Sequence, residues 1–525
     1  MKKQLLTICA GVALSLSALM AQTVETLPVY LDDSQPIEAR VQDALSRMTV
    51  EEKARLSYAQ GKFSSPGCPR LGIPELWYSD GPHGVRAEIN WNDWGYAGWT
   101  SDSCTAFPAL TCLAATWNLE LSGKYGKALG EEALYRGKDV QLGPGVNIYR
   151  TPLNGRNFEY MGEDPYLAAE MCVPYIQELQ KNGVAACVKH YALNNQELWR
   201  GHIDVEVSDR ALYEIYLPAF KAAVERGGAW SIMGSYNKVR GTHATHHKLL
   251  NNDILKGEWK FDGCVVTDWG AAHDTYEAAM YGLDLEMGSY TNGLTSESEF
   301  GYDDYYLGKT YLKMIKEGKI PMEVVDDKAG RVLRLIFRTA MNRKKSFGSM
   351  ASPAHYQVAY EVATEGTVLL KNGNGKKQAG LLPAVPGTYK NILVVGDNAV
   401  RNLMQGGGSS ELKPKDFISP LDGLRKKYGN VTYAQGYKAG RPMYGNVEEI
   451  PQAVMDSLRE DAVAKAKEAD LVIYVGGLNK NHQQDCEAGD RITYNLPFGQ
   501  DELIRSLLGV NTVSYTHLTL PTIRL

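Results

Sequence analysis

Short apolar runs alternate with amphipathic helical stretches from about residue 40 to residue 345, and this alternation limits the fold more than any other feature. Three of the runs, residues 184–188, 230–233 and 264–266, are too short for helices and are followed directly by polar residues. Strands that alternate with helices are typical of a parallel sheet or barrel. The sequence therefore predicts an α/β fold with a parallel sheet or barrel; in a (β/α)8 barrel, Lys189, His190, Tyr236 and Asp268 would all face one pocket.

Helix start and stop signals lie between these strands. Thr49 and Glu52 have the spacing of a capping box, in which each satisfies a free backbone N–H of the other. Ser208 begins a second predicted helix, which Gly227 ends. Its apolar face is predicted to consist of Leu212, Ile215, Tyr216 and Phe220.

A second domain is expected because 525 residues are more than one hydrophobic core usually serves. Residues 341–353 have lost both the helical and the strand periodicity, which indicates a connection between domains. Beyond it, residues 391–396 and 471–476 have the composition of buried strands with helical material nearby. This half is therefore predicted to be a layered α/β domain.

The two ends of the chain differ from the rest. Lys2 and Lys3 precede an apolar stretch over residues 5–20 and then Ala21-Gln22, a pattern typical of a secretory signal that is cleaved near Ala21. A retained membrane anchor is the alternative, although the stretch is shorter than the ~20 residues that span a bilayer. The expected domains are a signal at 1–21, a barrel at 22–345, an incomplete sandwich at 346–513 and an atypical tail at 514–525.

Composition excludes several classes of partner and cofactor. The 56 basic residues are balanced by 61 acidic ones, and no basic run could follow a phosphate backbone, so nucleic acid is not an expected partner. The cysteines form neither a CxxC pair nor a zinc-like spacing with histidine. Three histidines within residues 242–247 lack the acidic neighbours of a catalytic zinc site and are predicted to lie on a loop at the pocket rim. The glycines at 406–408 lack the spacing of a phosphate-binding loop.

Asp268 is the first candidate catalytic residue. Hydrolysis of a glycosidic bond needs two carboxyl groups, one that donates a proton to the leaving oxygen and one that attacks or stabilises the anomeric centre. Asp268 follows an apolar strand, and the adjacent Trp269 could stack on the apolar face of a sugar. A helix N-cap or turn residue is the alternative interpretation of an Asp in this position.

Glu487 is the second candidate, in the polar segment 485–491 after the predicted strand that ends at Gly476. An ordinary surface loop with a local salt bridge is the alternative interpretation. Spacing alone gives no distance between Glu487 and Asp268.

Four charged or polar residues suit a pocket for sugar hydroxyl groups, which bind well to charged and bidentate partners. They are Asp80, Arg156, Lys189 and His190. Alternatives remain for two of them, because Asp80-Gly-Pro is also ordinary turn chemistry and Arg156 could pair with Glu163.

Five ordered motifs carry a resemblance to a known family. They are Asp80-Gly-Pro-His-Gly-Val-Arg86, the stretch from Gly143-Pro-Gly-Val-Asn147 to Gly155-Arg-Asn-Phe-Glu-Tyr-Met-Gly-Glu-Asp-Pro165, Lys189-His-Tyr-Ala-Leu-Asn-Asn-Gln-Glu197, Met233-Gly-Ser-Tyr-Asn237 and Val266-Thr-Asp-Trp-Gly270. From about residue 40 to Val513 the chain resembles glycoside hydrolase family 3. The resemblance implies a (β/α)8-like domain with the nucleophile and an α/β sandwich that lends the acid/base.

The same resemblance implies roles for individual residues. Asp268 takes the nucleophile position, and Glu487 matches the family's acid/base segment, with Ala488 in place of the usual glycine. Trp269 falls on a position that flanks the neighbouring subsite. The residues that match positions holding the glycone or supporting the nucleophile are Asp80, Arg156, Lys189, His190 and Tyr236.

The expected function is that of a secreted or periplasmic retaining β-glucosidase that acts on oligosaccharides or β-glucosides without metal or organic cofactor. An ionised Asp268 is expected to raise the pKa of Glu487 and so keep it protonated. A β-xylosidase of the same family and a truncated, inactive carbohydrate-binding fragment are the alternatives. After signal removal no membrane association is expected, and a homo-oligomer is left open.

Overall fold

The computed structural model describes residues 27–288, 301–373, 380–403, 407–443, 446–511 and 516–519. The chain divides into two compact units, residues 1–48 and 49–525. The predicted signal at 1–21 lies outside the described residues, as does the predicted tail except for 516–519. In the described ranges no helix combines the length and the apolar character needed to cross a membrane.

The first unit contains the 3₁₀ turn η1 (Val29–Leu31) and the helix α2 (Ile37–Arg47). The two are joined by hydrogen bonds in both directions. Tyr30 N donates to Asp43 Oδ2 at 3.0 Å, and Arg40 Nε donates to Tyr30 O at 3.1 Å. These bonds satisfy polar groups that burial would otherwise leave unpaired.

The second unit is built on a six-stranded sheet in the order β1-β2-β3-β4-β6-β9. All neighbours are parallel except the short β1, which pairs antiparallel with β2. The strands are β1 (Ser64–Ser65), β2 (Leu76–Asp80), β3 (Val140–Leu142), β4 (Ala185–Tyr191), β6 (Ser231–Gly234) and β9 (Cys264–Thr267). The three strands predicted at 184–188, 230–233 and 264–266 are therefore confirmed, and each is buried along its length.

Single parallel bridges continue the curl of this sheet beyond β9. Val266 bridges Leu285, and Tyr58 bridges Glu286. The result is a barrel-like α/β domain, as predicted, in which isolated bridges take the place of some of the strands of a regular eightfold barrel.

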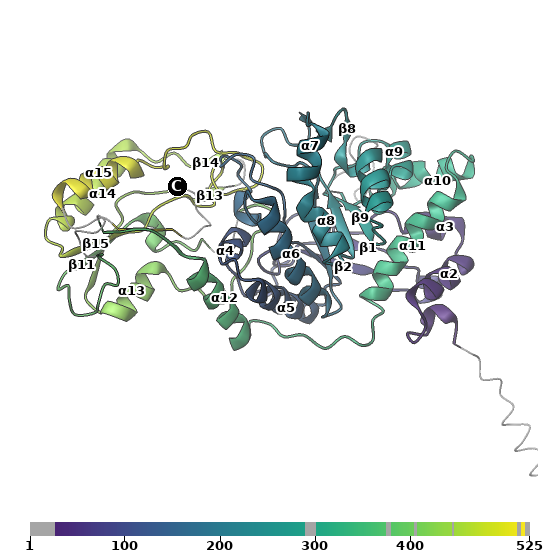
Figure 1. The fold of residues 1–525 in the computed structure, drawn as a ribbon, viewed down its shortest axis with the longest axis horizontal. Helices are drawn as coiled ribbons and strands as arrows, with labels where there is room; N and C mark the ends of the chain where they lie inside the picture. Colours follow the sequence, from purple (N-terminus) through teal and green to yellow (C-terminus); the bar gives the residue numbers. More distant parts are fainter. Residues whose placement is uncertain are drawn as a thin grey trace, which may run out of the picture. The chain divides into compact units, whose positions relative to one another are not determined.

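Helices cover the outside of the sheet, and α5 (Leu119–Tyr135), α6 (Pro165–Gln180) and α8 (Pro218–Glu225) lie side by side (Figure 1). Gly126 lets α5 and α6 approach closely, since a Cβ at this position would lie 2.1 Å from Tyr175 O. The predicted capping box is confirmed at α3 (Val50–Arg55), where Thr49 and Glu52 exchange both hydrogen bonds.

The helix predicted from Ser208 to Gly227 is interrupted. Ser208 caps α7 (Asp209–Ala211), but a π-helical turn, η4 (Leu212–Tyr216), separates it from α8. Pro218 cannot donate a backbone hydrogen bond, so the α-helical ladder does not run through it. The wider turn also rotates Ile215 away from the apolar face. Its side chain is 40% exposed, contrary to the prediction.

No helix or strand lies between α11 (Met322–Arg338) and α12 (Pro353–Gly366), in the region predicted to connect two domains. Beyond α12, a parallel sheet in the order β12-β11-β15 is formed by β11 (Ile392–Val395), β12 (Val431–Ala434) and β15 (Leu471–Tyr474). Leu393 and Val395 pack toward α14 (Gln452–Ala466) and α15 (Gln500–Val510), while Val394 packs with Leu421 of α13 (Pro420–Tyr428). Helices therefore lie on both faces, which confirms the α/β sandwich; the exact domain boundaries stay a prediction.

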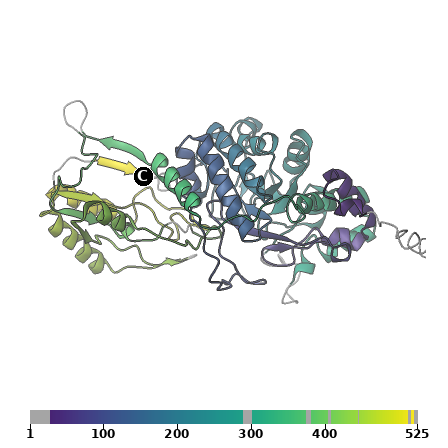
Figure 2. The same cartoon turned by 90° about the horizontal axis from the view of Figure 1, so that it is seen from below.

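A second small sheet joins the start of this half to the end of the chain. β10 (Val368–Asn372) pairs antiparallel with β16 (Thr516–Thr519), and Figure 2 shows the green and yellow arrows next to each other. The remaining α-helices and strands are α4 (Leu110–Ala115), α9 (Thr275–Met280), α10 (Lys309–Lys316), β5 (Asp204–Val205), β7 (Lys238–Val239), β8 (Thr242–His243), β13 (Pro442–Met443) and β14 (Asn446–Val447).

Candidate active site

The predicted polar residues of the barrel meet at one edge of its sheet. Asp80 ends β2, Lys189 and His190 lie in the second half of β4, and Asp268 directly follows β9. Tyr236, two residues beyond β6, reaches Asp268 with its hydroxyl group. The sequence-based expectation that these side chains converge is confirmed in its geometry, because parallel strands bring their carboxyl ends to the same edge.

The two oxygens of Asp268 have different surroundings. Oδ1 accepts hydrogen bonds from Tyr236 OH at 3.0 Å and from Trp269 N at 2.8 Å. Oδ2 has no hydrogen-bond partner among the described residues and lies 3.5 Å from His190 Nε2. One oxygen is thus held in place while the other is free to meet a substrate. The helix N-cap interpretation is wrong, since the next helix, α9, begins at Thr275 and is capped by Asp274.

Asp80 and Lys189 form a buried ion pair, with Lys189 Nζ 2.8 Å from Asp80 Oδ1. Asp80 Oδ1 also accepts from Gly81 N at 2.7 Å, so the turn interpretation and the site interpretation hold together. Burial by itself lowers the pKa of Lys189, but the carboxylates of Asp80 and Glu159 reverse the effect and raise it. Lys189 therefore remains a cation within the pocket.

The segment around Glu487 is fastened to the loops of the barrel. The carboxylate of Asp490 accepts backbone N–H groups from Gly155 and Glu197 at 3.0 Å, and Arg491 N donates to Leu153 O at 2.8 Å. Gly155 is needed at this contact, because a Cβ there would lie 2.1 Å from the carbonyl oxygen of residue 489. The interpretation of 485–491 as an ordinary surface loop is therefore wrong.

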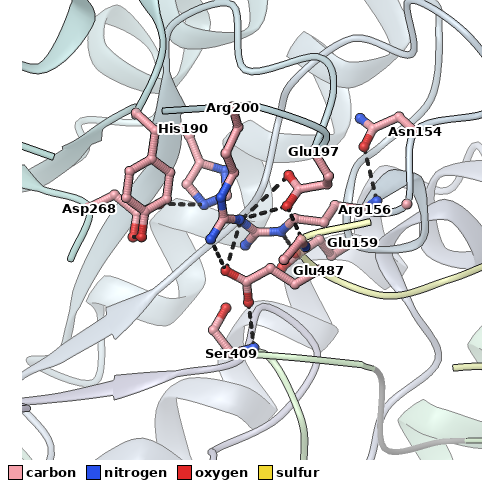
Figure 3. A network of polar contacts seen from close by, with 12 residues as sticks. Asn154, Arg156, Glu159, His190, Glu197, Arg200, Asp268, Ser409 and Glu487 are labelled. Carbon is pink, nitrogen blue, oxygen red and sulfur yellow. Dashed lines mark hydrogen bonds and ion pairs between the residues drawn. The ribbon is translucent and has the colours of Figure 1, made fainter. Parts of the chain in front are cut away.

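The carboxylate of Glu487 is held from three directions (Figure 3). Oε1 accepts from Arg200 Nη2 at 2.7 Å and lies 3.7 Å from Arg156 Nη1. Oε2 accepts from Ser409 N at 2.6 Å. Gly408 allows this approach, since it has a φ of +91° and a Cβ there would lie 2.4 Å from that of Glu487. Glu487 thus belongs to the same polar network as the barrel residues.

The charge state of this network differs from the expectation. Burial acts to raise the pKa of Glu487, but Arg156, Arg200 and the Ser409 contact outweigh it and hold the pKa well below its usual range. Burial raises the pKa of Asp268, and the charge of Glu487 adds to that rise. The prediction that Asp268 keeps Glu487 protonated is therefore wrong for this arrangement, because two guanidinium groups lie closest to Glu487.

His190 is a neutral member of the site. Burial, followed by the charge of Arg156, lowers its pKa well below the usual value. Its Nδ1 is 3.1 Å from Tyr160 OH, and its Nε2 faces Asp268. His190 can therefore exchange hydrogen bonds with its neighbours without supplying a positive charge to Asp268.

Arg156 has a different partner from the one that sequence reasoning offered. Its Nε donates to Glu159, three residues along the chain, rather than to Glu163. The guanidinium also lies 4.0 Å from Glu197 Oε1, and all three side chains are buried. Arg156 thus links the pocket wall to the acid/base candidate.

Four functional residues were missed by sequence reasoning: Glu159, Glu197, Arg200 and Ser409. Arg200 Nη1 donates to Glu197 Oε2 at 2.6 Å, and Ala488 N donates to the same oxygen at 2.8 Å. Burial raises the pKa of Glu197 to about 7. The sequence signal for Glu197 and Arg200 was an acid and a base three residues apart within a polar stretch. That spacing by itself is equally typical of an ion pair on the surface.

Trp269 lies beside the pocket with its indole fixed. Its Nε1 donates to Lys62 O at 2.7 Å, and its ring centroid is 5.0 Å from that of Phe63. The indole is largely buried, so its orientation is set by these contacts before any ligand arrives.

Several buried polar atoms at the site have no hydrogen-bond partner among the described residues. They are Asp268 Oδ2, Arg156 Nη1, Glu159 Oε2, Glu197 Oε1 and Arg86 Nε. Arg156 Nη1 and Glu197 Oε1 nevertheless face each other at 4.0 Å, and Glu159 Oε2 lies 3.7 Å from Lys189 Nζ, so these three atoms have ion-pair partners. Asp268 Oδ2, beside the neutral His190, is the buried acceptor that is left for a ligand.

The histidines of residues 242–247 take separate structural roles. His243 stacks on His273 with ring centroids 3.8 Å apart, and His247 caps the π-helical segment η6 (Lys248–Glu258). His246 does have an acidic neighbour, Glu277, at 3.0 Å, contrary to the expectation that none is near. In the part of the chain that the structure describes, no group of three His, Cys, Asp or Glu side chains is arranged to hold a metal ion.

A barrel-like parallel sheet with two carboxyl groups in one buried polar network has the features of a glycoside hydrolase. The model of the glycosyl hydrolase family 3 N-terminal domain matches residues 69–335, and that of the C-terminal domain matches residues 367–522. The chain belongs to glycosyl hydrolase family 3.

Similar curated proteins carry several activity names. The chain is 79% identical to beta-glucosidase BoGH3A of Bacteroides ovatus over 512 residues, which cover 97% of the chain and 68% of that protein. It is 34% identical to thermostable beta-glucosidase B of Acetivibrio thermocellus, and this match covers 90% of the chain and 58% of that protein. An exo-alpha-(1->6)-L-arabinopyranosidase of Bifidobacterium longum is 36% identical, with 88% and 58% covered. The chain thus spans about two thirds or less of the length of these relatives.

Solved structures agree with the fold. A GH3 beta-glucosidase of Bifidobacterium adolescentis has a TM-score of 0.74 at 34% identity. The match covers 89% of this chain and 62% of the chain of that structure. Beta-glucosidase 3B of Thermotoga neapolitana, solved with α-D-glucose, has a TM-score of 0.76 at 28% identity, with 92% and 72% covered. The likeness spans both the barrel-like domain and the sandwich.

Proposed function

We propose that the chain is an exo-acting, retaining β-glucosidase that releases glucose from the non-reducing end of β-glucosides, with Asp268 as nucleophile and Glu487 as acid/base. One observation carries this proposal, namely that contacts through the side chains of Tyr236 and Arg200 connect the two carboxyl groups. Tyr236 OH donates to Asp268 Oδ1 at 3.0 Å, the Arg200 guanidinium lies 4.4 Å from the Tyr236 ring centroid, and Arg200 Nη2 donates to Glu487 Oε1 at 2.7 Å. The beta-glucosidase names of similar proteins favour glucose as the glycone.

In the first step the free oxygen of Asp268 attacks the anomeric carbon, and the bond from that carbon to the leaving oxygen breaks. The leaving oxygen takes a proton from Glu487, and a glycosyl ester forms on Asp268. In the second step Glu487 removes a proton from water, the water oxygen attacks the anomeric carbon, and the carboxylate of Asp268 departs. Two inversions give net retention.

The bound glycone is proposed to be held by the charged pocket. Asp80, Lys189, Arg156 and His190 present donors and acceptors around the carboxyl end of the sheet. Hydrogen bonds to charged groups are stronger than those between neutral groups, so these contacts can orient the ring over Asp268.

The arrangement of Glu487 fits the second step as it stands, because an ionised carboxylate is the form of a general base. The first step needs the protonated form. We infer that the proton is taken up when substrate enters and Glu487 loosens its contact with Arg200.

Replacing Arg200 with Gln is expected to move the alkaline limb of the pH profile of kcat/KM to higher pH. Removal of the cation 2.7 Å from Glu487 raises the pKa of that carboxyl, so its protonated form persists at higher pH. The measurement is kcat/KM on an aryl β-glucoside across pH. The Arg200→Lys variant keeps the charge and should leave the limb near its wild-type position; a limb that stays in place in both variants would contradict the proposed control by Arg200.

The glycone preference is tested with aryl β-glucoside, aryl β-xyloside and aryl α-L-arabinopyranoside. The two pentosides lack the hydroxymethyl group of glucose, and the loss of a single methylene from a fitted pocket already costs roughly 10-fold to 200-fold in kcat/KM. The glucoside is therefore expected to be preferred by at least about tenfold. A preference for the xyloside would favour the β-xylosidase alternative, whereas binding of glucose without any hydrolysis would favour the inactive carbohydrate-binding alternative.

We also propose that the protein is exported to the periplasm or secreted. The support is the sequence of residues 1–21, with its two lysines and its apolar stretch. A mature protein that begins near Gln22 by mass spectrometry would agree with this proposal, and one that retains Met1 would contradict it.

A further inference from the structure

The acid/base candidate Glu487 lies in a long irregular loop. Residues 475–499, which connect β15 to α15, contain no helix or strand. A side chain on such a loop is placed by the contacts of the loop with other parts of the molecule rather than by a rigid element. The contacts that fix the backbone around Glu487 therefore decide where its carboxylate lies.

Two carboxylates join this loop to the barrel segment that follows β4, and each accepts hydrogen bonds from the backbone of the other segment. Asp490, on the loop, accepts from Glu197 N and Leu198 N at 3.0 Å. Glu197, on the barrel segment, accepts from Ala488 N at 2.8 Å through Oε2. Backbone donors from both segments are thus satisfied across the contact, and one of them directly follows Glu487 in the chain.

Glu197 is buried, with 2% of its surface exposed. Its Oε2 also accepts from Arg200 Nη1 at 2.6 Å, and Arg200 Nη2 donates to Glu487 at 2.7 Å (Figure 3). A buried carboxylate needs such partners, because it has lost its contact with water. Glu197 is therefore connected to Glu487 in two ways, through the Ala488 backbone and through the Arg200 side chain.

Ala488 has a backbone conformation that favours glycine. Its φ is +65°, in the left-handed region, where a Cβ comes too close to the backbone. A glycine would adopt this conformation without that penalty. Because an alanine does not, another contact must stabilise the peptide, and the hydrogen bond from Ala488 N to Glu197 is such a contact.

We propose that Glu197 is a positioning residue for the acid/base, because its carboxylate holds Ala488 in the left-handed conformation and so fixes the direction in which the side chain of Glu487 points. The inference rests on the proposed β-glucosidase function with Glu487 as acid/base. Glu197 makes no bond to the reacting atoms in this role. It acts on both steps through Glu487, on proton donation to the leaving oxygen and on proton removal from water.

The Glu197→Ala variant is expected to affect substrates according to their need for a proton. On phenyl β-glucoside, whose leaving oxygen must be protonated, kcat/KM should fall about 10²-fold, the size of effect that a displacement of about 1 Å produces. On 2,4-dinitrophenyl β-glucoside, whose leaving group departs without a proton, kcat/KM should stay within about threefold of wild type. Steady-state rates on the two substrates give the comparison.

A split between kcat and KM separates positioning from loss of folded protein. On the dinitrophenyl substrate the second step still needs Glu487 as base, so kcat of Glu197→Ala should fall by about tenfold or more. The glycosyl-enzyme then accumulates, and KM should fall by a similar factor. A smaller fraction of correctly folded protein would instead lower kcat and leave KM unchanged.

The Ala488→Gly background tests the backbone part of the inference. Glycine tolerates the left-handed conformation, so the loop should keep its shape with less help from Glu197. The loss that Glu197→Ala causes on phenyl β-glucoside should therefore be smaller in this background by about fivefold or more, the factor set by the penalty of a left-handed alanine. A loss of the same size in both backgrounds would overturn the inference, since Glu197 would then not act through the Ala488 backbone.

Glu170→Ala is the matched control, because it also removes the carboxylate partner of an arginine. Glu170 Oε2 accepts from Arg226 Nη2 at 2.7 Å. This pair joins α6 to the end of α8, among the helices outside the sheet. Its loss should leave the rates on both substrates at their wild-type values.

Equal losses of Glu197→Ala on the two substrates with KM unchanged, or no loss on either, would also overturn the inference. Wild-type protein without activity on any glucoside would instead refute the proposed function. Undiminished kcat/KM of Glu487→Ala on phenyl β-glucoside would likewise refute the acid/base assignment on which the inference rests.

Discussion

The Asp268→Ala variant is expected to lose on the order of 10⁴-fold or more in kcat on an aryl β-glucoside. The variant lacks the oxygen that attacks the anomeric carbon, so no glycosyl ester can form. The unpartnered Oδ2, buried in the pocket and 3.5 Å from His190 Nε2, is the atom on which this prediction depends. The measurement is the steady-state rate of release of the aryl group.

Loss of folding must be separated from loss of chemistry in this experiment. The substitution leaves Trp269 N without its acceptor, which costs about 1–3 kcal/mol if no water replaces it, whereas Tyr236 OH keeps a second acceptor, Trp269 O, at 3.2 Å. Asp268→Asn keeps an amide oxygen that can accept from these donors, so this variant should unfold close to the wild-type temperature. If either variant keeps turnover near the wild-type value, Asp268 is not the nucleophile.

The Glu487→Ala variant is expected to lose roughly 10²-fold to 10⁴-fold in kcat/KM on a substrate with a poor leaving group. Substrates with an activated leaving group need no proton in the first step, so their glycosyl-enzyme forms but is hydrolysed slowly. Added azide should restore their turnover, because it is a nucleophile that needs no general base. The product should be the β-glycosyl azide, detected by NMR.

Asp485 provides the control for this experiment, since it is a second acid only two residues from Glu487 in the same segment. The Asp485→Ala variant should respond little to azide. Rescue of Asp485→Ala by azide, with none for Glu487→Ala, would move the acid/base assignment to Asp485.

The barrel half of the site could be predicted from sequence because its physics is local and periodic. Each predicted strand is a short apolar run, and the polar residue after it must lie at the carboxyl edge of a parallel sheet. Lys189 and Asp268 are therefore placed by pattern alone, whereas the strand that ends at Asp80, β2, was not among the predicted ones. Where the local pattern met a proline, at Pro218, the predicted continuous helix proved wrong.

The position of Glu487 could not be predicted from spacing. It depends on backbone contacts between segments far apart in the chain, such as the bonds from Gly155 and Glu197 to Asp490. Family resemblance supplied the assignment, and the structure supplies a physical reason for the close approach, which is the space left by Gly155 and Gly408.

The charge state of Glu487 was mispredicted for a related reason. The expectation considered only Asp268 as a neighbour, whereas Arg200 and Arg156 lie at 2.7 Å and 3.7 Å from the carboxylate. Sequence reasoning did not consider Arg200, and only the folded arrangement shows that this side chain reaches Glu487. An opposite charge at such distances outweighs burial.

Mass spectrometry of the Glu487→Ala protein during turnover of 2,4-dinitrophenyl β-glucoside tests both proposed roles in one experiment. Without its general base the enzyme should accumulate one glucosyl group, attached to the peptide that contains Asp268. An adduct on a different carboxylate, or a protein that turns over the substrate rapidly without any adduct, would contradict a catalytic pair made of these two residues.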